Sequence, residues 1–259
     1  MCISLIAHKT HPEYRLILAF NRDENHSRPT EPLGYWKDNP SILAGRDLKA
    51  EGTWLGVSRS GKFANVTNYR DLRIPYKKNA PSRGQLISQF LTGTDNPENF
   101  LEEIQLNADQ YNRFSLIIGD SAKLYYFSNI ENKIRELSSG ICGLSNHLLD
   151  TPWPKVECGK KRLAKLIANK SFHIDEIFNI LSDKTIAEDS NLPDTGFGRD
   201  FERVASPLFV VNQKFGTRSS SVILIDYQGR VSFSEKTFDK EGNIINAKNY
   251  NIKIKTNGI

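Results

Sequence analysis

Cysteine and long apolar runs are both scarce in this chain, and each scarcity excludes a class of protein. The 259 residues include three cysteines, an odd number without a CxxC spacing, so we expect neither a disulfide framework nor a structural zinc site. No apolar stretch approaches the roughly 20 residues of a membrane-spanning helix. The first residues also lack the basic segment and apolar length of a signal peptide. We therefore expect a cytoplasmic protein with no stable membrane insertion.

Clustered positive charge is missing as well. The formal net charge is +5, but the lysines are scattered, and clusters such as Lys160-Lys161-Arg162 are too short for a polybasic tract. No RNP, zinc-finger or basic-zipper pattern is present, so we expect no nucleic-acid partner. The five histidines show no metal-ligand spacing, and no Walker or dinucleotide motif surrounds the glycines. We predict no bound metal; the expected partner is a small-molecule ligand or substrate, and the oligomeric state is left open.

The sequence pattern alternates between blocks of strands and blocks of helices. Alternating β-rich segments predict strands over 2–8, 15–21, 54–58, 62–67, 114–119, 124–128, 208–212, 219–226 and 230–237. Helical periodicity predicts helices over 83–92, 97–105, 154–169 and 173–182. Two polar segments, 27–40 with three prolines and 184–200 with Pro193, are predicted to be loops.

This order of elements predicts an α+β fold rather than a plain sandwich or a doubly wound sheet. Hairpins join most of the strands, so the sheets should be mostly antiparallel. Two face-to-face sheets with helices outside would bury both helical blocks, whereas strict βαβ alternation is absent. We therefore predict a four-layer αββα sandwich, formed by residues 1–259 as a single domain with no linker.

Cys2, which follows the initiator methionine, is the most informative single residue. A side chain this small allows a methionine aminopeptidase to remove Met1, which would leave a thiol and an α-amine on one residue. An α-amine has a pKa near ~7.7–8.0, so part of it is neutral at pH 7 and can accept the thiol proton. The alternative is a structural cysteine on the first strand, and position 2 alone does not exclude it.

Several polar motifs accompany Cys2, most of them at the ends of predicted strands. They are Asn21-Arg22-Asp23-Glu24 with Ser27-Arg28-Pro29, Gly52-Thr53-Trp54-Leu55-Gly56, Thr67-Asn68-Tyr69, Gly143-Leu144-Ser145-Asn146 with Thr151-Pro152-Trp153-Pro154-Lys155, and Gly216-Thr217-Arg218. In this order they resemble the NRDE family, which includes the eukaryotic transport and Golgi organisation protein 2, over nearly the whole chain. The resemblance implies the N-terminal-nucleophile hydrolase fold, and more distantly a likeness to cysteine acylases that cleave penicillin V and conjugated bile salts.

The resemblance to the acylases also implies roles for individual residues. Cys2 would be the nucleophile, Arg22 and Asp23 would orient it and balance its charge, and Arg218 would complete the charge network. Asn68 and Asn146 would donate hydrogen bonds to an oxyanion or contact the terminal amine. The expected substrate contacts are Asn21, Trp54, Thr67, Tyr69 and Ser145.

One departure from the acylases concerns Arg22 and Asp23, which are adjacent here but separated by two residues there. Neighbours on a regular strand point to opposite faces, so both can face Cys2 only if the strand ends or bulges. The alternatives for these residues are structural. Arg22 and Asp23 could form an ion pair at a strand end, Asn146 could cap a turn, and Trp54 could be a core or rim aromatic.

Two functions follow from the resemblance. The first is an amidohydrolase in which Cys2 attacks a small or amphipathic amide and water then releases the acid. The second is a non-catalytic protein that binds and moves haem, a lipid or acyl-coenzyme A on the same fold. No cofactor is expected for the enzyme, whereas haem is possible as a transported ligand. A small polar pocket beside Cys2 favours the first function, and a deep slot lined by aromatics favours the second.

Overall fold

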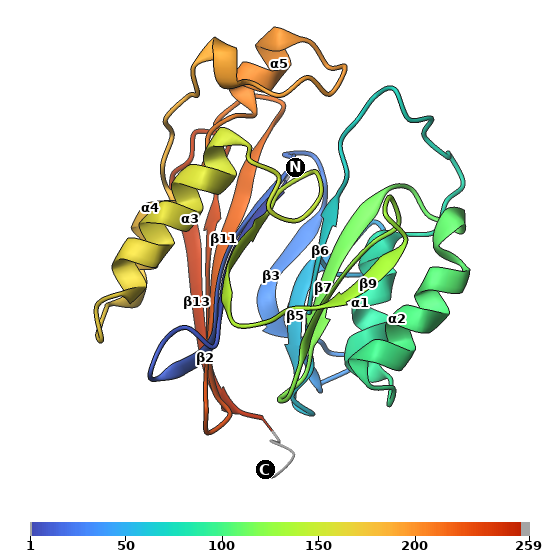
Figure 1. The fold of residues 1–259 in the computed structure, drawn as a ribbon, viewed down its shortest axis with the longest axis vertical. Helices are drawn as coiled ribbons and strands as arrows, with labels where there is room; N and C mark the ends of the chain where they lie inside the picture. Colours follow the sequence, from blue (N-terminus) through green and yellow to red (C-terminus); the bar gives the residue numbers. More distant parts are fainter. Residues whose placement is uncertain (1, 255–259) are drawn as a thin grey trace.

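The computed structural model describes residues 2–254, and its strands form two antiparallel sheets that lie face to face (Figure 1). The first sheet has the order β10–β1–β2–β11–β12–β13, with β1 Cys2–His8, β2 Tyr14–Asn25, β10 Gly140–Leu144, β11 Phe215–Asp226, β12 Arg230–Phe238 and β13 Ile244–Lys253. The second runs from β3 to β9 in chain order, with β3 Thr30–Tyr35, β4 Ile42–Asp47, β5 Leu55–Ser58, β6 Phe63–Asn68, β7 Phe114–Gly119, β8 Leu124–Ser128 and β9 Lys133–Glu136.

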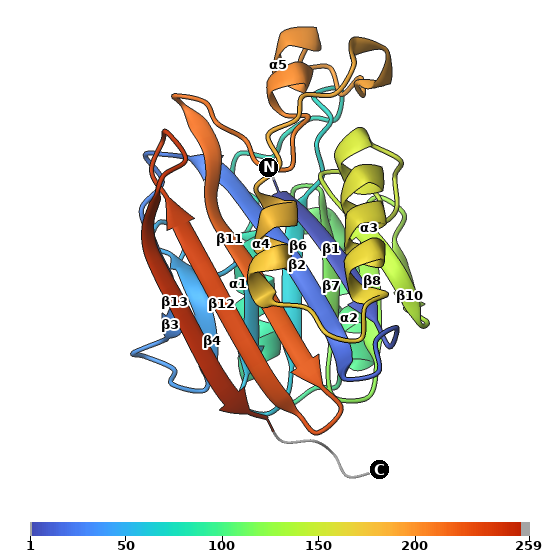
Figure 2. The ribbon, with the colours of Figure 1, turned by 90° about the vertical axis from the view of Figure 1, so that its left-hand side faces the viewer.

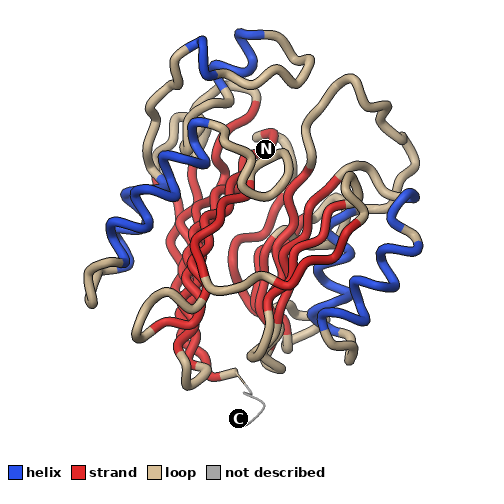
Figure 3. Tube along the Cα trace, in the orientation of Figure 1, coloured by secondary structure: helices blue, strands red, loops and turns tan. Residues whose placement is uncertain are grey.

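Helices cover the outer face of each sheet, which confirms the predicted four-layer αββα arrangement (Figure 3). The pair α3 and α4 packs on the first sheet, and Figure 2 shows both lying across it. The pair α1 and α2 packs on the second sheet. A short α5 lies at the end of the molecule where β1 begins (Figure 1). The bounds are α1 Arg83–Thr92, α2 Pro97–Leu106, α3 Pro154–Ile167, α4 Ile174–Leu181 and α5 Arg199–Val204, with 3₁₀ turns at Ala108–Gln110 and Asp189–Asn191.

The first two strands are apolar on both faces because both faces of their sheet are covered. Ile3, Leu5 and Ala7 of β1 pack against the helices α3 and α4. The intervening Ser4 and Ile6 face the second sheet, and the Ser4 hydroxyl donates a 2.7 Å hydrogen bond to Asn65 Oδ1 of β6. A strand between two layers needs apolar residues on both sides, and the sequence of β1 meets that need.

Local signals explain where the helices begin. Pro97 occupies the first turn of α2, and the Asn96 side chain accepts a hydrogen bond from the Asn99 backbone N–H. At α4, His173 and Glu176 form a reciprocal cap of the helix start. These are among the boundaries that the sequence pattern predicted to within a residue or two.

Five strands were not predicted, namely β3, β4, β9, β10 and β13, and the sequences of four of them show why. The segment over 27–40 contains β3, a sheet-edge strand whose pairing with β4 is irregular between Glu31 and Gly34. Prolines are tolerated at such edges, so the loop prediction there was wrong. β9 and β13 are also edge strands, rich in charged or polar residues. β10 carries two glycines in five residues, which weakens any strand signal.

One predicted strand is absent and another is longer than expected. Residues 208–212 form no strand; instead Leu208, Phe209 and Val210 are buried in an irregular segment that leads into β11. Burial without regular pairing gives the same apolar run in the sequence, so the pattern was ambiguous. β2 continues past residue 21 to Asn25 and carries Arg22 and Asp23 within the strand. That continuation decides how the two side chains point.

Candidate active site

Cys2 is the first residue of β1, and both its backbone N–H and its carbonyl are hydrogen-bonded. It pairs with Arg22 of β2 in the antiparallel register, so the two residues share the face directed at the second sheet. Its backbone N–H donates to Asn146 Oδ1 at 3.1 Å. Its carbonyl accepts a 2.9 Å hydrogen bond from the Ser145 hydroxyl. The Ser145-Asn146 pair after β10 therefore fixes the position of the thiol.

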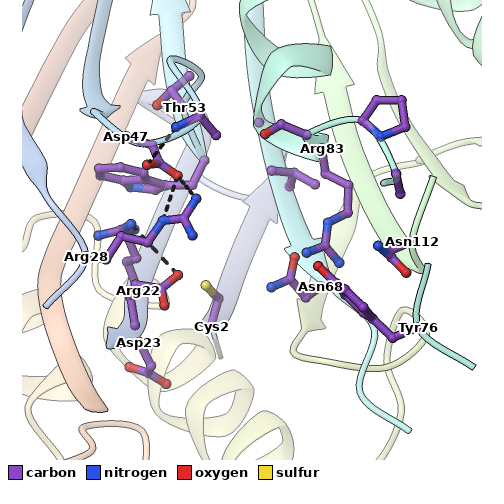
Figure 4. Close-up of a pocket in the computed structure, with 18 residues that line it drawn as sticks. Cys2, Arg22, Asp23, Arg28, Asp47, Thr53, Asn68, Tyr76, Arg83 and Asn112 are labelled. Atoms are coloured by element: carbon purple, nitrogen blue, oxygen red, sulfur yellow. Dashed lines mark hydrogen bonds and ion pairs between the residues drawn. The ribbon is translucent and has the colours of Figure 1, made fainter. Parts of the chain in front are cut away.

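Asn146 also connects the two sheets beneath this cysteine. Its Nδ2 donates to the Asn68 carbonyl at 2.9 Å, and its own carbonyl accepts the Arg70 backbone N–H at 2.8 Å. Both polar atoms of the Asn146 side chain are thus committed, one to Cys2 and one to the end of β6. Of the two predicted asparagines, Asn68 is the one that lines the cavity beside the thiol (Figure 4).

Arg22 is held in place by Trp54. The guanidinium carbon lies 3.9 Å from the centroid of the indole, which is itself 7% exposed. Nη1 donates to Thr30 Oγ1 at 3.1 Å, and Nη2 lies 4.0 Å from the Glu24 carboxylate. Burial lowers the pKa of Arg22, and its charge opposes, as a minor influence, the rise that burial causes in the pKa of the Cys2 thiol. The arginine therefore supplies a fixed positive charge next to the candidate nucleophile.

Asp23 takes the opposite face of β2, as a regular strand requires. The register of β2 with β1 is continuous, and the bulge lies instead in β11, which skips Arg218 between Thr217 and Ser219. Thr217 Oγ1 donates to Asp23 Oδ1 at 2.7 Å. Arg22 and Asp23 thus approach the start of β1 from two sides of the sheet, so the adjacency is accommodated without distorting β2.

Behind Asp23 lies a buried group of charges that the sequence reasoning missed. Lys155, at the start of α3, is 4% exposed and donates through Nζ to the Ala205 carbonyl at 2.9 Å. Burial raises the pKa of Asp23, and the charge of Lys155 is the strongest opposing influence. Burial lowers the pKa of Lys155 to about 8. A lysine is rarely buried, and the only sequence signal was its place in the Trp-Pro-Lys motif.

A buried ion pair lies near these two charged residues. Arg70 Nη2 and Glu202 Oε2 are 2.6 Å apart, with side chains 7% and 2% exposed. Thr195 also donates to the Glu202 carboxylate. The ion pair connects α5 to the segment that follows β6.

A polar cavity of about 270 Å³ opens beside Cys2. Figure 4 shows the sulfur between two walls, with Arg22, Arg28 and Asp47 on one side and Asn68, Tyr76 and Arg83 on the other. Arg28 is neutralised by Asp47, with a shortest N–O distance of 2.6 Å. Burial and the negative charge of Asp23 raise the pKa of the Cys2 thiol, partly offset by the backbone N–H of Asp23 and the charge of Arg22. The cavity is also lined by Asp23, Glu24, Thr53, Trp54, Ala80 and Asn112.

Four predicted site residues lie apart from the Cys2 cavity. Asn21 is fully buried on the helical side of β2, where its Nδ2 donates to two backbone carbonyls. Arg218 donates to three carbonyls between Asn25 and Arg28. Thr67 is buried within β6, and Tyr69 donates or accepts a 2.7 Å hydrogen bond with His147. Asn21 and Arg218 thus occupy positions that stabilise the frame around the site.

The remaining thiols and the possible ligand groups can be placed as well. Cys142 and Cys158 are unpaired and partly exposed, and burial raises the pKa of Cys142 to about 12. Within residues 2–254, no three His, Cys, Asp or Glu side chains come together as a metal site would require. In the same part of the chain, no helix has the length and apolar character needed to cross a membrane.

The chain has the four-layer αββα fold of the N-terminal-nucleophile hydrolases, with Cys2 at the start of the first strand. Two solved variants of conjugated bile acid hydrolase from Clostridium perfringens share this fold. Their TM-scores are 0.53 and 0.54, at 12% and 11% identity over 100% of both chains. Identity this low shows the fold alone.

The profile described as Transport and Golgi organisation 2 matches residues 1–240, and the chain belongs to this family. It is 35% identical to a Transport and Golgi organization protein 2 homolog of Bos taurus, over 92% of this chain and 93% of the relative. For the Homo sapiens homolog, identity is 34% over 93% and 95%. For the Drosophila melanogaster protein it is 26% over 92% of each chain. The resemblance inferred from the motifs is therefore confirmed.

Proposed function

We propose that this protein is an N-terminal cysteine amidohydrolase, with Cys2 as its nucleophile after removal of Met1. The observation that carries the proposal is the hydrogen bond from the Cys2 nitrogen to Asn146 Oδ1, beside a thiol that lines a polar cavity. After processing, that nitrogen would be the α-amine. Asn146 would then hold the amine on the same residue as the thiol, which is the geometry that a terminal nucleophile needs.

The reaction follows from these groups. The neutral amine accepts the thiol proton, and the sulfur attacks the carbonyl carbon of the amide. The C–N bond breaks as the leaving amine takes up that proton, which leaves an acyl thioester on Cys2. Water then attacks the thioester, releasing the acid and restoring the thiol. The α-amine of Cys2 accepts the proton from the thiol and later donates it to the leaving amine, so one group acts as both base and acid.

The residues around Cys2 can stabilise the two anions that form during this reaction, the thiolate and the oxyanion. Arg22 lies on the same face as Cys2 and favours the thiolate by its charge. Asn68 presents its amide to the cavity and is the candidate donor to the oxyanion. Asp23 also lines the cavity, and Lys155 is the strongest positive charge acting on it, so we assign both to the electrostatic balance of the site.

The shape and lining of the cavity favour an amide over haem. Haem would need an apolar slot, an axial ligand and basic groups for its propionates. Arginines are present, but the lining is mostly polar, and the volume of about 270 Å³ is below the roughly 300–1,000 Å³ of most ligand pockets. No histidine of residues 2–254 lines it. A small polar cavity beside Cys2 therefore supports a reacting amide at this position.

The test combines intact mass with thiol labelling. The protein is treated with iodoacetamide at pH 7.5, and the label is mapped by peptide, with Cys142 and Cys158 as internal controls. Protein from cells in which methionine aminopeptidase is inhibited gives the Met1-retaining form of the same chain. Burial raises the pKa of Cys2, so we expect that form to label slowly.

Loss of Met1 together with at least about tenfold faster labelling of Cys2 than in the Met1-retaining form supports the proposal. Retention of Met1 in normally expressed protein would overturn it. So would a processed Cys2 that reacts no faster than Cys142, since the terminal base would then be ineffective.

A further inference from the structure

A second cavity, of about 260 Å³, adjoins the Cys2 cavity and differs from it in chemistry. The two share Asn68, Tyr76, Arg83 and Asn112 on their common wall. Beyond that wall, the lining of the second cavity turns apolar, with Leu72, Ile74, Pro75, Phe197 and Phe201. A polar and a mainly apolar cavity therefore lie next to each other, with these four residues lining both.

Exposed apolar side chains gather at this second cavity. Leu72, Tyr76 and Phe197 are 57%, 72% and 39% exposed, and all three line it. Phe197 and Phe201 are stacked, with ring centroids 4.5 Å apart. Large apolar side chains that are exposed together mark an interaction site, whereas scattered ones need no explanation.

Hydrogen bonds and a buried ion pair hold the two sides of this cavity together. The Leu72 backbone N–H donates to the Thr195 carbonyl at 2.9 Å, which fixes the segment after β6 to the segment before α5. The buried ion pair of Arg70 and Glu202 also connects the segment after β6 to α5. The cavity is thus a built feature of the fold, formed by segments far apart in the sequence.

Arg83 stands where the two cavities meet, and its charge is not neutralised. Its Nη1 donates to the Arg113 carbonyl at 3.0 Å, and within residues 2–254 it forms no ion pair. Arg28, by contrast, is paired with Asp47, and Arg22 lies over Trp54 near Glu24. Figure 4 shows these ion pairs on the wall opposite Arg83. Arg83 is also the first residue of α1, where the helix dipole favours an anion.

We infer that the substrate is an amphipathic amide with a carboxylate group, which binds Arg83. Its hydrocarbon part lies against Leu72, Tyr76 and Phe197, and its carbonyl carbon reaches Cys2. This inference rests on the proposed function for the reaction, but the binding site itself does not require turnover. Arg83 is a specificity-determining residue, since a guanidinium forms stronger hydrogen bonds to an anion than to a neutral group.

The test measures binding to the Cys2→Ala variant, which has no nucleophilic side chain and so cannot form an acyl-enzyme. The probes are N-decanoylglycine and N-decanoylethanolamine, which share one acyl chain and differ in the charge of the amine part. Calorimetric titration should show the glycine conjugate binding at least about tenfold tighter, the ratio expected for one charge-assisted hydrogen bond. Arg83→Gln should remove that preference, and Arg83→Lys should restore part of it.

Arg73→Gln is the matched control, because Arg73 is exposed and paired with Asp71 on the same segment; it should keep the preference. Equal binding of both probes to the parent variant would overturn the inference, as would a preference that survives Arg83→Gln. A charge preference in protein whose Cys2 is unreactive would keep the binding site and reject the amidohydrolase. Equal turnover of both probes by processed protein would keep the amidohydrolase and reject the role of Arg83.

Discussion

Replacing Lys155 with methionine removes a buried positive charge that acts on Asp23. The two side chains come from different elements, α3 and β2, and the residues are 4% and 1% exposed. Methionine keeps the length of the side chain, so the change removes charge and the hydrogen bond to Ala205 with little loss of packing. The free energy of unfolding should fall by about 1–3 kcal/mol, because the Ala205 carbonyl loses its donor and the buried Asp23 carboxylate loses the strongest charge that favours its ionised form.

A double-mutant cycle isolates the interaction. Asp23→Asn keeps an oxygen that can accept from Thr217 while removing the negative charge. If the charges interact, the double variant should lose at least about 1 kcal/mol less than the sum of the single losses. The free energies of unfolding come from urea titrations at pH 7.5, compared at equal slope.

An exposed ion pair provides the control cycle. Lys123 and Glu136 are 2.9 Å apart, and each side chain is 51% exposed. Lys123→Met and Glu136→Gln should show no coupling above the error of the measurement, since solvent screens such pairs. If the cycle for Asp23 and Lys155 is additive to within about 0.5 kcal/mol, the buried interaction does not contribute, and the electrostatic account of this site fails.

The pH dependence gives a second readout of the same pair. Because burial lowers the pKa of Lys155 to about 8, the folded protein releases this proton at lower pH than the unfolded chain does. Above pH 8 the unfolded state therefore binds more protons, and the stability of the parent protein relative to Lys155→Met should rise with pH until about 10.4. A difference that is flat or falls over this window would contradict the assignment.

Two further substitutions test the frame of the site. Asn21→Ala leaves two backbone carbonyls, each now bonded at 2.8 Å, without their donor, and should cost about 2–3 kcal/mol in urea unfolding; a loss below about 0.5 kcal/mol would refute its structural role. Gly52→Ala would place a Cβ 2.4 Å from the backbone of Gly84 and should lower the melting temperature by several degrees, whereas Gly34→Ala, with its nearest neighbour 3.8 Å away, should change it little.

The sequence predicted the layers well because its strongest patterns coincide with regular elements. The hairpin of β7 and β8 was placed to the residue, as were the starts of α1, α2 and α3. Most of the strands that the sequence did not predict lie at the edges of the sheets. Their residues face solvent on one side and have one pairing partner, so charged and proline residues are tolerated and the alternation that marks a strand fades.

The candidate site was predictable only where its chemistry follows from strand order. Cys2 and Arg22 share a face because β1 and β2 form a hairpin, and that could be reasoned from alternation. Lys155 and Arg83 could not be found this way. Their roles depend on which helix start lies against which sheet end, and lysine or arginine at a helix start looks like an ordinary surface residue.

The bond between the Cys2 nitrogen and Asn146 has a practical consequence for anyone producing this protein. A purification tag fused ahead of Cys2 would turn the α-amine into a peptide amide, which cannot accept the thiol proton. A tagged preparation would then show no hydrolysis, whichever substrate was offered. β13 ends at Lys253, which pairs with Arg230 at the far end of the sheet (Figure 2). A tag attached after the last residue would leave the amine free, and reports of inactivity are informative only for protein made that way.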